Sequence, residues 1–206
     1  MLEGAALLVI LAASSLAMAC AQETGTQDPD ATAMEPPPGR VVDSIFPIEE
    51  EIRRFREGLP EVTAFSGGAP SRDALVERFV EVVESGELQP LAELVLTRSE
   101  FGYLYYPHTI YTAPPYELPP SLMWFQMENL SGRGLTRISQ RLAGNPLHVT
   151  GYTCEEPPLA QERNTVWNEC RLQMDPPDAD AYDIRLFGSI VERDGVFKFV
   201  SYSSEL

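Results

Sequence analysis

The stretch LFGSIVERDGVFKFVSYSSEL, residues 186–206, decides the fold because it holds the clearest hairpin signal in the chain. Asp194-Gly195 is typical of a two-residue β-turn, since both residue types tolerate a positive φ. Apolar, β-branched and aromatic residues lie on both sides of it. The pattern predicts two antiparallel strands, 184–193 and 196–204, joined at this dipeptide.

Two earlier runs, 147–155 and 165–174, also have strand character, and each carries a cysteine. A hairpin centred near Glu162 would set Cys154 opposite Cys170. In an oxidising compartment such a pair forms a disulfide, and closing a loop of about 15 residues contributes roughly 3 kcal/mol. Free buried thiols, or redox or metal chemistry, are the alternatives.

Helical patterns come before these strands. Ile45, Ile48, Ile52 and Phe55 form an apolar stripe, which predicts a helix within 44–58 that ends at Gly58. Ser71 is a typical N-cap, so a second helix begins there and ends at Gly86. A shorter helix is expected around 88–95 and a long one over 121–143. Between them FGYLYYPHTIYT, residues 101–112, predicts one or two strands that Pro107 interrupts.

This order of elements resembles the nuclear transport factor 2-like fold, which ketosteroid isomerases share. The closing segment quoted above resembles the final hairpin of such domains. SRDALVERFVEVVESGE and LTRSEFGYLYYP resemble stretches of secreted bacterial members. The resemblance covers about 71–206 and implies an α+β fold in the order ααββαββββ, with an extra N-terminal helix. Helices would pack in the concave face of a strongly curved, mostly antiparallel sheet, a cone with a pocket at its mouth. The fold hosts enzymes, binders and assembly modules, so it does not fix an activity.

The N-terminus has the pattern of an export signal. The apolar run AALLVILAASSLAMA, residues 5–19, is short for a membrane span and suits a signal peptide. Ala17-Met18-Ala19 leads directly into Cys20, which resembles the lipobox of bacterial lipoproteins. Cys20 is therefore the expected lipidation site; cleavage after Ala19 without a lipid, or an uncleaved anchor, are the alternatives. All three place the domain outside the cytoplasm.

The chain divides into a signal segment 1–20, a tether 21–43 and a single domain 44–206. The tether is polar and rich in Gly and Pro, and its roughly 23 residues span about 25 Å as a coil. The net charge of −16, from 31 acidic and 15 basic residues, disfavours nucleic acid and anionic lipid headgroups as partners.

Four aromatic residues are candidates for a ligand pocket: Tyr103, Tyr105, Trp124 and Phe125. Tyr103 and Tyr105 would share one face of a strand, although the sequence favours ordinary core packing over a pocket for all four. His108 could act as an acid or base, or simply lie in a loop. No metal motif, phosphate-binding loop or nucleophile elbow is present, so no catalytic residue, metal or cofactor is predicted.

These features favour a lipid-anchored envelope protein, held to the membrane through Cys20, with a non-catalytic domain. That domain would bind a small apolar ligand or an envelope partner. An isomerase-like or hydrolase-like enzyme is the first alternative, and an interior Asp or Glu with a raised pKa would favour it. A structural module that forms a homodimer is the second, and a broad apolar surface patch would favour that.

Overall fold

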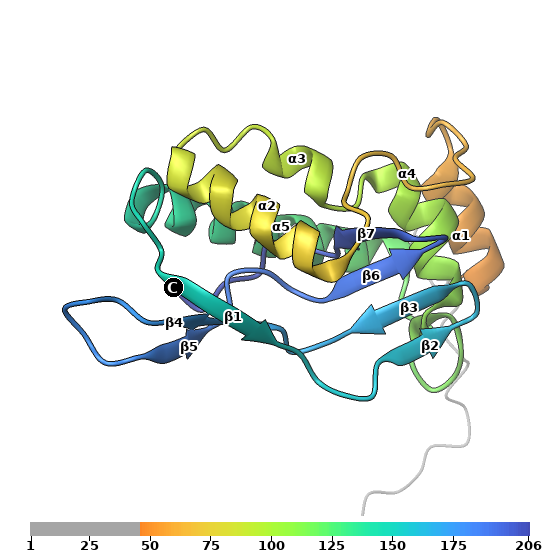
Figure 1. Cartoon of the computed structure of the whole chain (residues 1–206). Helices are drawn as coiled ribbons and strands as arrows, with labels where there is room; N and C mark the ends of the chain where they lie inside the picture. The colour runs from red at the N-terminus through yellow and green to blue at the C-terminus, as the bar shows by residue number, and fades with distance from the viewer. Residues whose placement is uncertain (1–45) are drawn as a thin grey trace, which may run out of the picture. The chain divides into compact units, whose positions relative to one another are not determined.

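The described part of the chain, residues 46–206, passes through its helices before it reaches its strands (Figure 1). This computed structural model has antiparallel pairing in both of its sheets, which confirms the predicted α+β class. Ser44–Leu206 form one compact unit. The predicted signal segment, the tether and Cys20 lie outside the described residues.

The four predicted helices form close to the expected places. They are α1 (Ile48–Arg56), α2 (Arg72–Ser85), α3 (Leu91–Leu94) and α5 (Pro120–Arg141). The Ser71 hydroxyl caps α2 by accepting a hydrogen bond from the Ala74 N–H, and Gly86 ends it with φ +77°. Local signals therefore set both ends of this helix.

The strands predicted for 101–112 are wrong, because this segment is helical. It follows directly on α4 (Arg98–Glu100) and contains the π-helix η1 (Phe101–Tyr105) and two 3₁₀ turns, η2 (Tyr106–His108) and η3 (Ile110–Thr112). Thr97 and Glu100 form a capping box that starts the helix. Phe101, Leu104 and Tyr105 then bury their side chains at helical spacing, and this packing outweighs the strand propensity of aromatic residues.

The predicted strands are confirmed in part, because the predicted runs are shortened or interrupted. The run 165–174 divides into β3 (Asn164–Trp167) and β4 (Arg171–Met174), and the run 184–193 shortens to β6 (Ile190–Arg193). β1 (Val149–Thr153) and β7 (Val196–Phe199) lie within the runs 147–155 and 196–204, whereas β2 (Leu159–Gln161) and β5 (Tyr182–Ile184) lie mostly outside the predicted runs. The strands form two separate sheets, β1-β4-β5 and β2-β3-β6-β7.

The predicted hairpin at Asp194-Gly195 is confirmed, with φ +51° and +81° at the two turn residues.

Figure 1 shows the helices on one side of the strands, with α2 in front and α5 behind it. α5 approaches the last segment of the chain closely at Gly134. A Cβ atom there would lie 1.7 Å from the Tyr202 carbonyl oxygen, so only glycine fits.

Candidate functional site: a filled interior and a groove beside α2

The space between α2 and the strands is filled by aromatic side chains. Phe79, Phe187, Phe199 and Tyr202 are each no more than 1 % exposed. The ring centroids of Phe187 and Phe199 are 4.3 Å apart, and Phe79 lies 5.2 and 5.6 Å from them. The Tyr202 hydroxyl donates to the carbonyl of Leu91 at 2.6 Å, which leaves it engaged inside the protein.

The four pocket candidates do not meet in one cavity. Tyr105 is buried, and burial raises the pKa of its hydroxyl to about 12. Tyr103 is half-buried beneath the guanidinium of Arg56, whose central carbon lies 4.5 Å from the ring centroid. Because 101–105 is helical, the two tyrosines do not share a strand face as expected.

Trp124 and Phe125 are neighbours in sequence, but their side chains project from different sides of α5. Trp124 is half-buried and lines a shallow hollow of about 290 Å³ with Thr97 and Met127. Phe125 points outward and is 61 % exposed. Three of the four candidates therefore belong to the apolar packing around Phe101, and the fourth belongs to the surface.

An interior carboxylate is present, but it is held as half of a fixed ion pair. Glu100 and Lys198, the chain's single lysine, each have a 1 % exposed side chain and lie 2.8 Å apart. Glu100 also accepts hydrogen bonds from the N–H groups of Ser66 and Thr97. Burial raises the pKa of Glu100, but the bonds from Lys198, Thr97 and Ser66 outweigh it and leave the pKa below its ordinary value. This is the opposite of the raised pKa that an acid–base enzyme needs.

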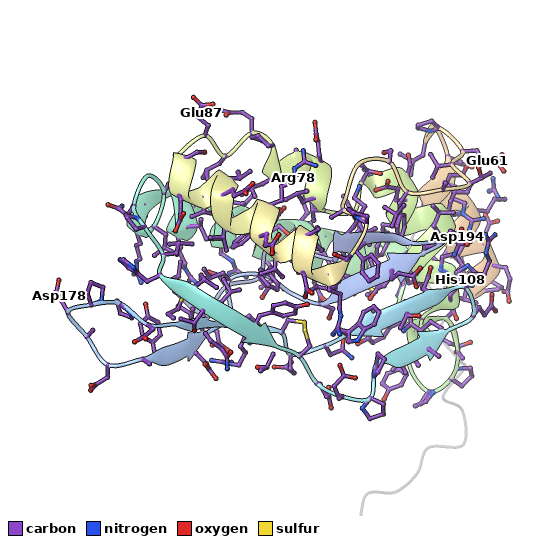
Figure 2. The ribbon with its side chains drawn as sticks, viewed as in Figure 1. Glu61, Arg78, Glu87, His108, Asp178 and Asp194 are labelled. Atoms are coloured by element: carbon purple, nitrogen blue, oxygen red, sulfur yellow. A yellow bond between two sulfur atoms is a disulfide. The ribbon has the colours of Figure 1, made fainter. Side chains whose placement is uncertain are left out.

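A second buried polar cluster holds the helical segment 101–108 to the sheet. The Leu104 carbonyl accepts from the Asn164 amide at 2.8 Å and from Arg193 at 3.3 Å. Arg193 also donates to the Asn164 side-chain oxygen at 2.9 Å. His108, at the end of the segment, lies 2.7 Å from Glu162 in the β2–β3 turn, and Arg163 of that turn pairs with Asp194 of the neighbouring turn at 2.6 Å (Figure 2). These polar side chains serve packing between elements.

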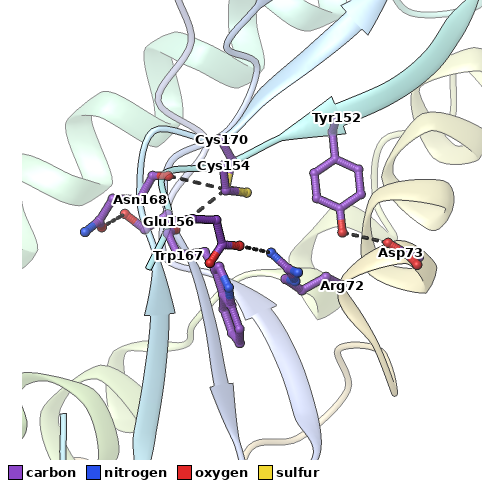
Figure 3. The surroundings of a disulfide bond; sticks show 9 residues. Arg72, Asp73, Tyr152, Cys154, Glu156, Trp167, Asn168 and Cys170 are labelled. Carbon is purple, nitrogen blue, oxygen red and sulfur yellow. Dashed lines mark hydrogen bonds and ion pairs between the residues drawn. A yellow bond between two sulfur atoms is a disulfide. The ribbon is translucent and has the colours of Figure 1, made fainter. Parts of the chain in front are cut away.

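Cys154 and Cys170 form a disulfide, as the sequence predicted (Figure 3). Thr153 pairs with Arg171 across the antiparallel strands β1 and β4, so Cys154, one residue after Thr153, faces Cys170, one residue before Arg171, and the two Cα atoms are 4.0 Å apart. The bond joins the chain where β1 ends and β4 begins. It therefore ties the first sheet together at the line where the strands break.

The N-terminal turn of α2 lies against this disulfide region. The Arg72 guanidinium carbon is 4.6 Å from the centroid of the Trp167 ring, and Arg72 pairs with Glu156 at 3.4 Å. The Tyr152 hydroxyl donates to Asp73 at 2.7 Å (Figure 3). Burial, followed by this bond to Asp73, raises the pKa of Tyr152 to about 12. α2 is thus anchored on β1 at this end.

A groove of about 440 Å³ runs from that anchor along α2 and β1. Its apolar part comes from Val76, Val80 and Val149, and its rim carries carboxylates at every fourth residue of α2: Asp73, Glu77 and Glu81. β1 is the edge strand of its sheet, so half of its backbone groups have no strand partner. The groove can accept an elongated or apolar group that carries positive charge.

The α2 half of the groove is visible in the sequence and the β1 half is not. Acids at every fourth position in SRDALVERFVEVVES place three carboxylates in one row. Nothing in the sequence shows that Val149–Tyr152, about 70 residues later, lies beside that row. Within residues 46–206 no group of three or more His, Cys, Asp or Glu side chains could hold a metal ion. No helix in this range has the length and apolar character to cross a membrane.

Comparison with known proteins found no matching family model, no matching curated protein and no matching solved structure. The resemblance to nuclear transport factor 2-like domains therefore remains an expectation from the sequence. The site has to be interpreted from its own geometry.

Proposed function

We propose that this chain is an exported, lipid-anchored envelope protein whose domain is not catalytic and binds an envelope partner at its surface. The observation that carries the proposal is the filled interior. In a cone-like domain a ligand would occupy the space that Phe79, Phe187, Phe199 and Tyr202 fill here. Binding is thereby left to the outside of the domain.

The disulfide supports export, because paired structural cysteines persist in oxidising compartments and are rare in the cytosol. The leader supports a lipid at Cys20, since small residues precede that cysteine directly. Glu100 supports a non-catalytic domain, because its carboxylate is already saturated by Lys198 and two backbone N–H groups.

The groove between α2 and β1 is the site that fits a protein partner best. Its carboxylates favour a partner segment with lysine or arginine, and its valines favour apolar side chains beside them. The unpaired edge of β1 adds backbone donors and acceptors for an extended segment.

A small apolar ligand in the same groove is the second candidate. The volume of about 440 Å³ lies in the range of small-molecule sites, and the apolar part of the groove is formed by three valines. Such a ligand would be held less tightly than in a closed interior, because the groove is open to solvent along its carboxylate rim.

Mass spectrometry of the protein from its native envelope separates these possibilities. We expect an acylated Cys20 and no small molecule released on unfolding. A stoichiometric small molecule that Val80→Asp abolishes would favour the second candidate. A Cys20→Ala variant should lose the acyl mass and leave the membrane fraction; retention of that variant in the membrane contradicts the lipid anchor.

A further inference from the structure

The outward face of α5 differs from the rest of this acidic protein. Three large apolar side chains project from it, with exposed fractions of 43 % for Leu122, 61 % for Phe125 and 41 % for Leu130. Five of the eight exposed large hydrophobic residues of the described chain fall between 110 and 130, so exposure of this kind is concentrated here.

The same face carries positive charge and no acid. Arg133, Arg137 and Arg141 follow the apolar residues at intervals of one turn and are exposed. At 3.6 residues per turn, all six side chains fall within an arc of about 160°. Glu128 is the helix's single acid, about 140° from the middle of that arc. It lines the hollow beside Trp124 instead.

These arginines have no carboxylate partner within the described residues, and Arg137 donates only a long hydrogen bond of 3.5 Å to the Ser204 carbonyl. Most arginines elsewhere in the described fold pair with carboxylates, as Arg53 does with Glu50 and Arg163 does with Asp194. Within residues 46–206, none of the three arginines of α5 takes part in an ion pair. We call this face, with its six residues Leu122, Phe125, Leu130, Arg133, Arg137 and Arg141, the α5 face.

The described chain starts beside the helix that carries this face. The described chain begins at Phe46 and enters α1, and α1 packs against α5. Ile48 and Ile52 of α1 belong to the same apolar cluster as Met123 of α5. A tether of about 23 residues spans roughly 25 Å, so a lipid on Cys20 keeps this side of the domain within reach of the bilayer.

We propose that the α5 face docks on the anionic phospholipid surface that holds the lipidated Cys20. Phe125, Leu122 and Leu130 enter the headgroup boundary, and the three arginines bind lipid phosphates. This inference rests on the lipid anchor of the proposed function. The net charge of −16 does not prevent docking, since at about 0.1 M salt charges more than about 10 Å away are screened.

The test uses a chain that begins at Ala21, which lacks both the leader and the acylated cysteine and keeps the whole compact unit 44–206. It is mixed with vesicles of phosphatidylcholine, with or without phosphatidylglycerol, and sedimented. We expect partition onto the anionic vesicles that falls with added salt. Each arginine near an anionic surface strengthens binding roughly five-fold, so replacing all three by Gln should weaken it roughly 100-fold.

Two further variants make the result specific to the α5 face. The double variant Phe125→Ser, Leu130→Ser should weaken partition by roughly ten-fold or more, because it removes two apolar side chains that would be transferred from water into the membrane. The matched control replaces Arg53, Arg163 and Arg171 by Gln, which changes the net charge equally at sites paired with Glu50, Asp194 and Glu205. This control should lose no more than a few-fold. Near-ultraviolet circular dichroism verifies that each variant is folded.

The absence of partition onto anionic vesicles would overturn the inference, and so would equal partition onto neutral vesicles or an equal loss in the control variant. None of these results bears on the anchor, which the acyl mass at Cys20 tests separately. Conversely, an unmodified Cys20 would remove the anchor while leaving vesicle binding through the α5 face intact.

Discussion

α2 and α5 share the apolar cluster around Phe79 and Ile138 but present opposite chemistry to their surroundings. α2 buries Leu75, Phe79 and Val83 and turns the acids Asp73, Glu77 and Glu81 outward beside the groove. α5 buries Met127, Gly134 and Ile138 and turns the α5 face outward. The difference teaches that the buried side chains of these helices stabilise the fold, whereas their solvent-exposed side chains determine what the domain can bind.

The contrast also explains why composition alone misleads for this protein. The net charge of −16 predicts a surface that avoids anionic partners. The acids are concentrated elsewhere, however, and α5 carries three arginines against one glutamate. A local face of this kind can bind a surface that the protein as a whole would repel.

Replacing Phe79 by Ala should have the largest effect, because this side chain fills the interior under α2. We expect a loss of about 3–5 kcal/mol in the free energy of unfolding, from lost burial and the cavity left behind. Urea unfolding measures it. A loss below about 1 kcal/mol would mean that the interior is loosely packed and would weaken the contrast between filled core and functional surface.

Removing the disulfide should be next in size. Cys154 and Cys170 are 16 residues apart in sequence, and a cross-link over such a loop contributes about 3 kcal/mol. The double variant Cys154→Ala, Cys170→Ala should lose about that amount relative to the oxidised protein. Reductant should lower the unfolding midpoint of the wild-type chain and leave that of the double variant unchanged. An unaffected wild-type chain contradicts a structural role for the bond.

Two glycines of α5 provide a matched pair of alanine substitutions with opposite expected effects on the free energy of unfolding. At Gly134 a Cβ atom would meet the Tyr202 carbonyl, so Gly134→Ala should cost about 1–3 kcal/mol or more. At Gly132 no atom lies within 4 Å, so Gly132→Ala should stabilise the protein by about 0.5–1 kcal/mol through helix propensity. Thermal unfolding compares them. Equal effects of the two substitutions would show that α5 does not pack closely against the Tyr202 backbone at Gly134.

The buried ion pair gives a pH dependence with a defined sign. The pKa of Glu100 is below its ordinary value of 4.5 in the folded protein. The ionised carboxylate therefore stabilises the fold above that value, and its contribution disappears as pH falls through the folded pKa. Glu100→Gln should be less stable than wild type at neutral pH, and this difference in stability should narrow as the pH falls below 4.5. A gap that widens contradicts the assignment.

Tyr152→Phe should have the smallest effect, since the hydroxyl-to-Asp73 bond at the end of the groove is exposed to solvent. We expect a loss of about 0.5 kcal/mol. The absorbance titration of the wild type should show one more tyrosine with a pKa of about 12 than the titration of the variant, in which Tyr105 and Tyr106 still titrate there. If the two titrations coincide, α2 is not anchored on β1 through this bond.

The sequence predicts those parts of the fold whose signals are local. Ser71 and Gly86 mark the ends of α2, Asp194-Gly195 marks the last hairpin, and symmetric spacing about Glu162 places the two cysteines opposite each other. Each of these signals acts through a few neighbouring residues, so no knowledge of tertiary packing is needed.

The failures concern packing between distant elements. Phe101–Thr112 has strand propensity but forms helical turns, because its aromatic side chains are buried against α1 and α5. The capping box of Thr97 and Glu100 is the sequence feature that indicates a helix start here. The break between β3 and β4 contains Glu169, whose φ is +47°. The groove needs β1 beside α2, and the Glu100–Lys198 pair joins residues 98 positions apart. Neither arrangement leaves a pattern along the chain.

Photocrosslinking in cells tests most directly whether the groove beside α2 binds a protein and the α5 face binds the membrane. Benzoylphenylalanine is placed either at Thr150 in the groove or at Phe125 on the α5 face of the full-length protein. We predict protein adducts from position 150 and phospholipid adducts from position 125. Protein adducts from position 125 together with lipid adducts from position 150 would contradict the account, as would a failure of both positions to react.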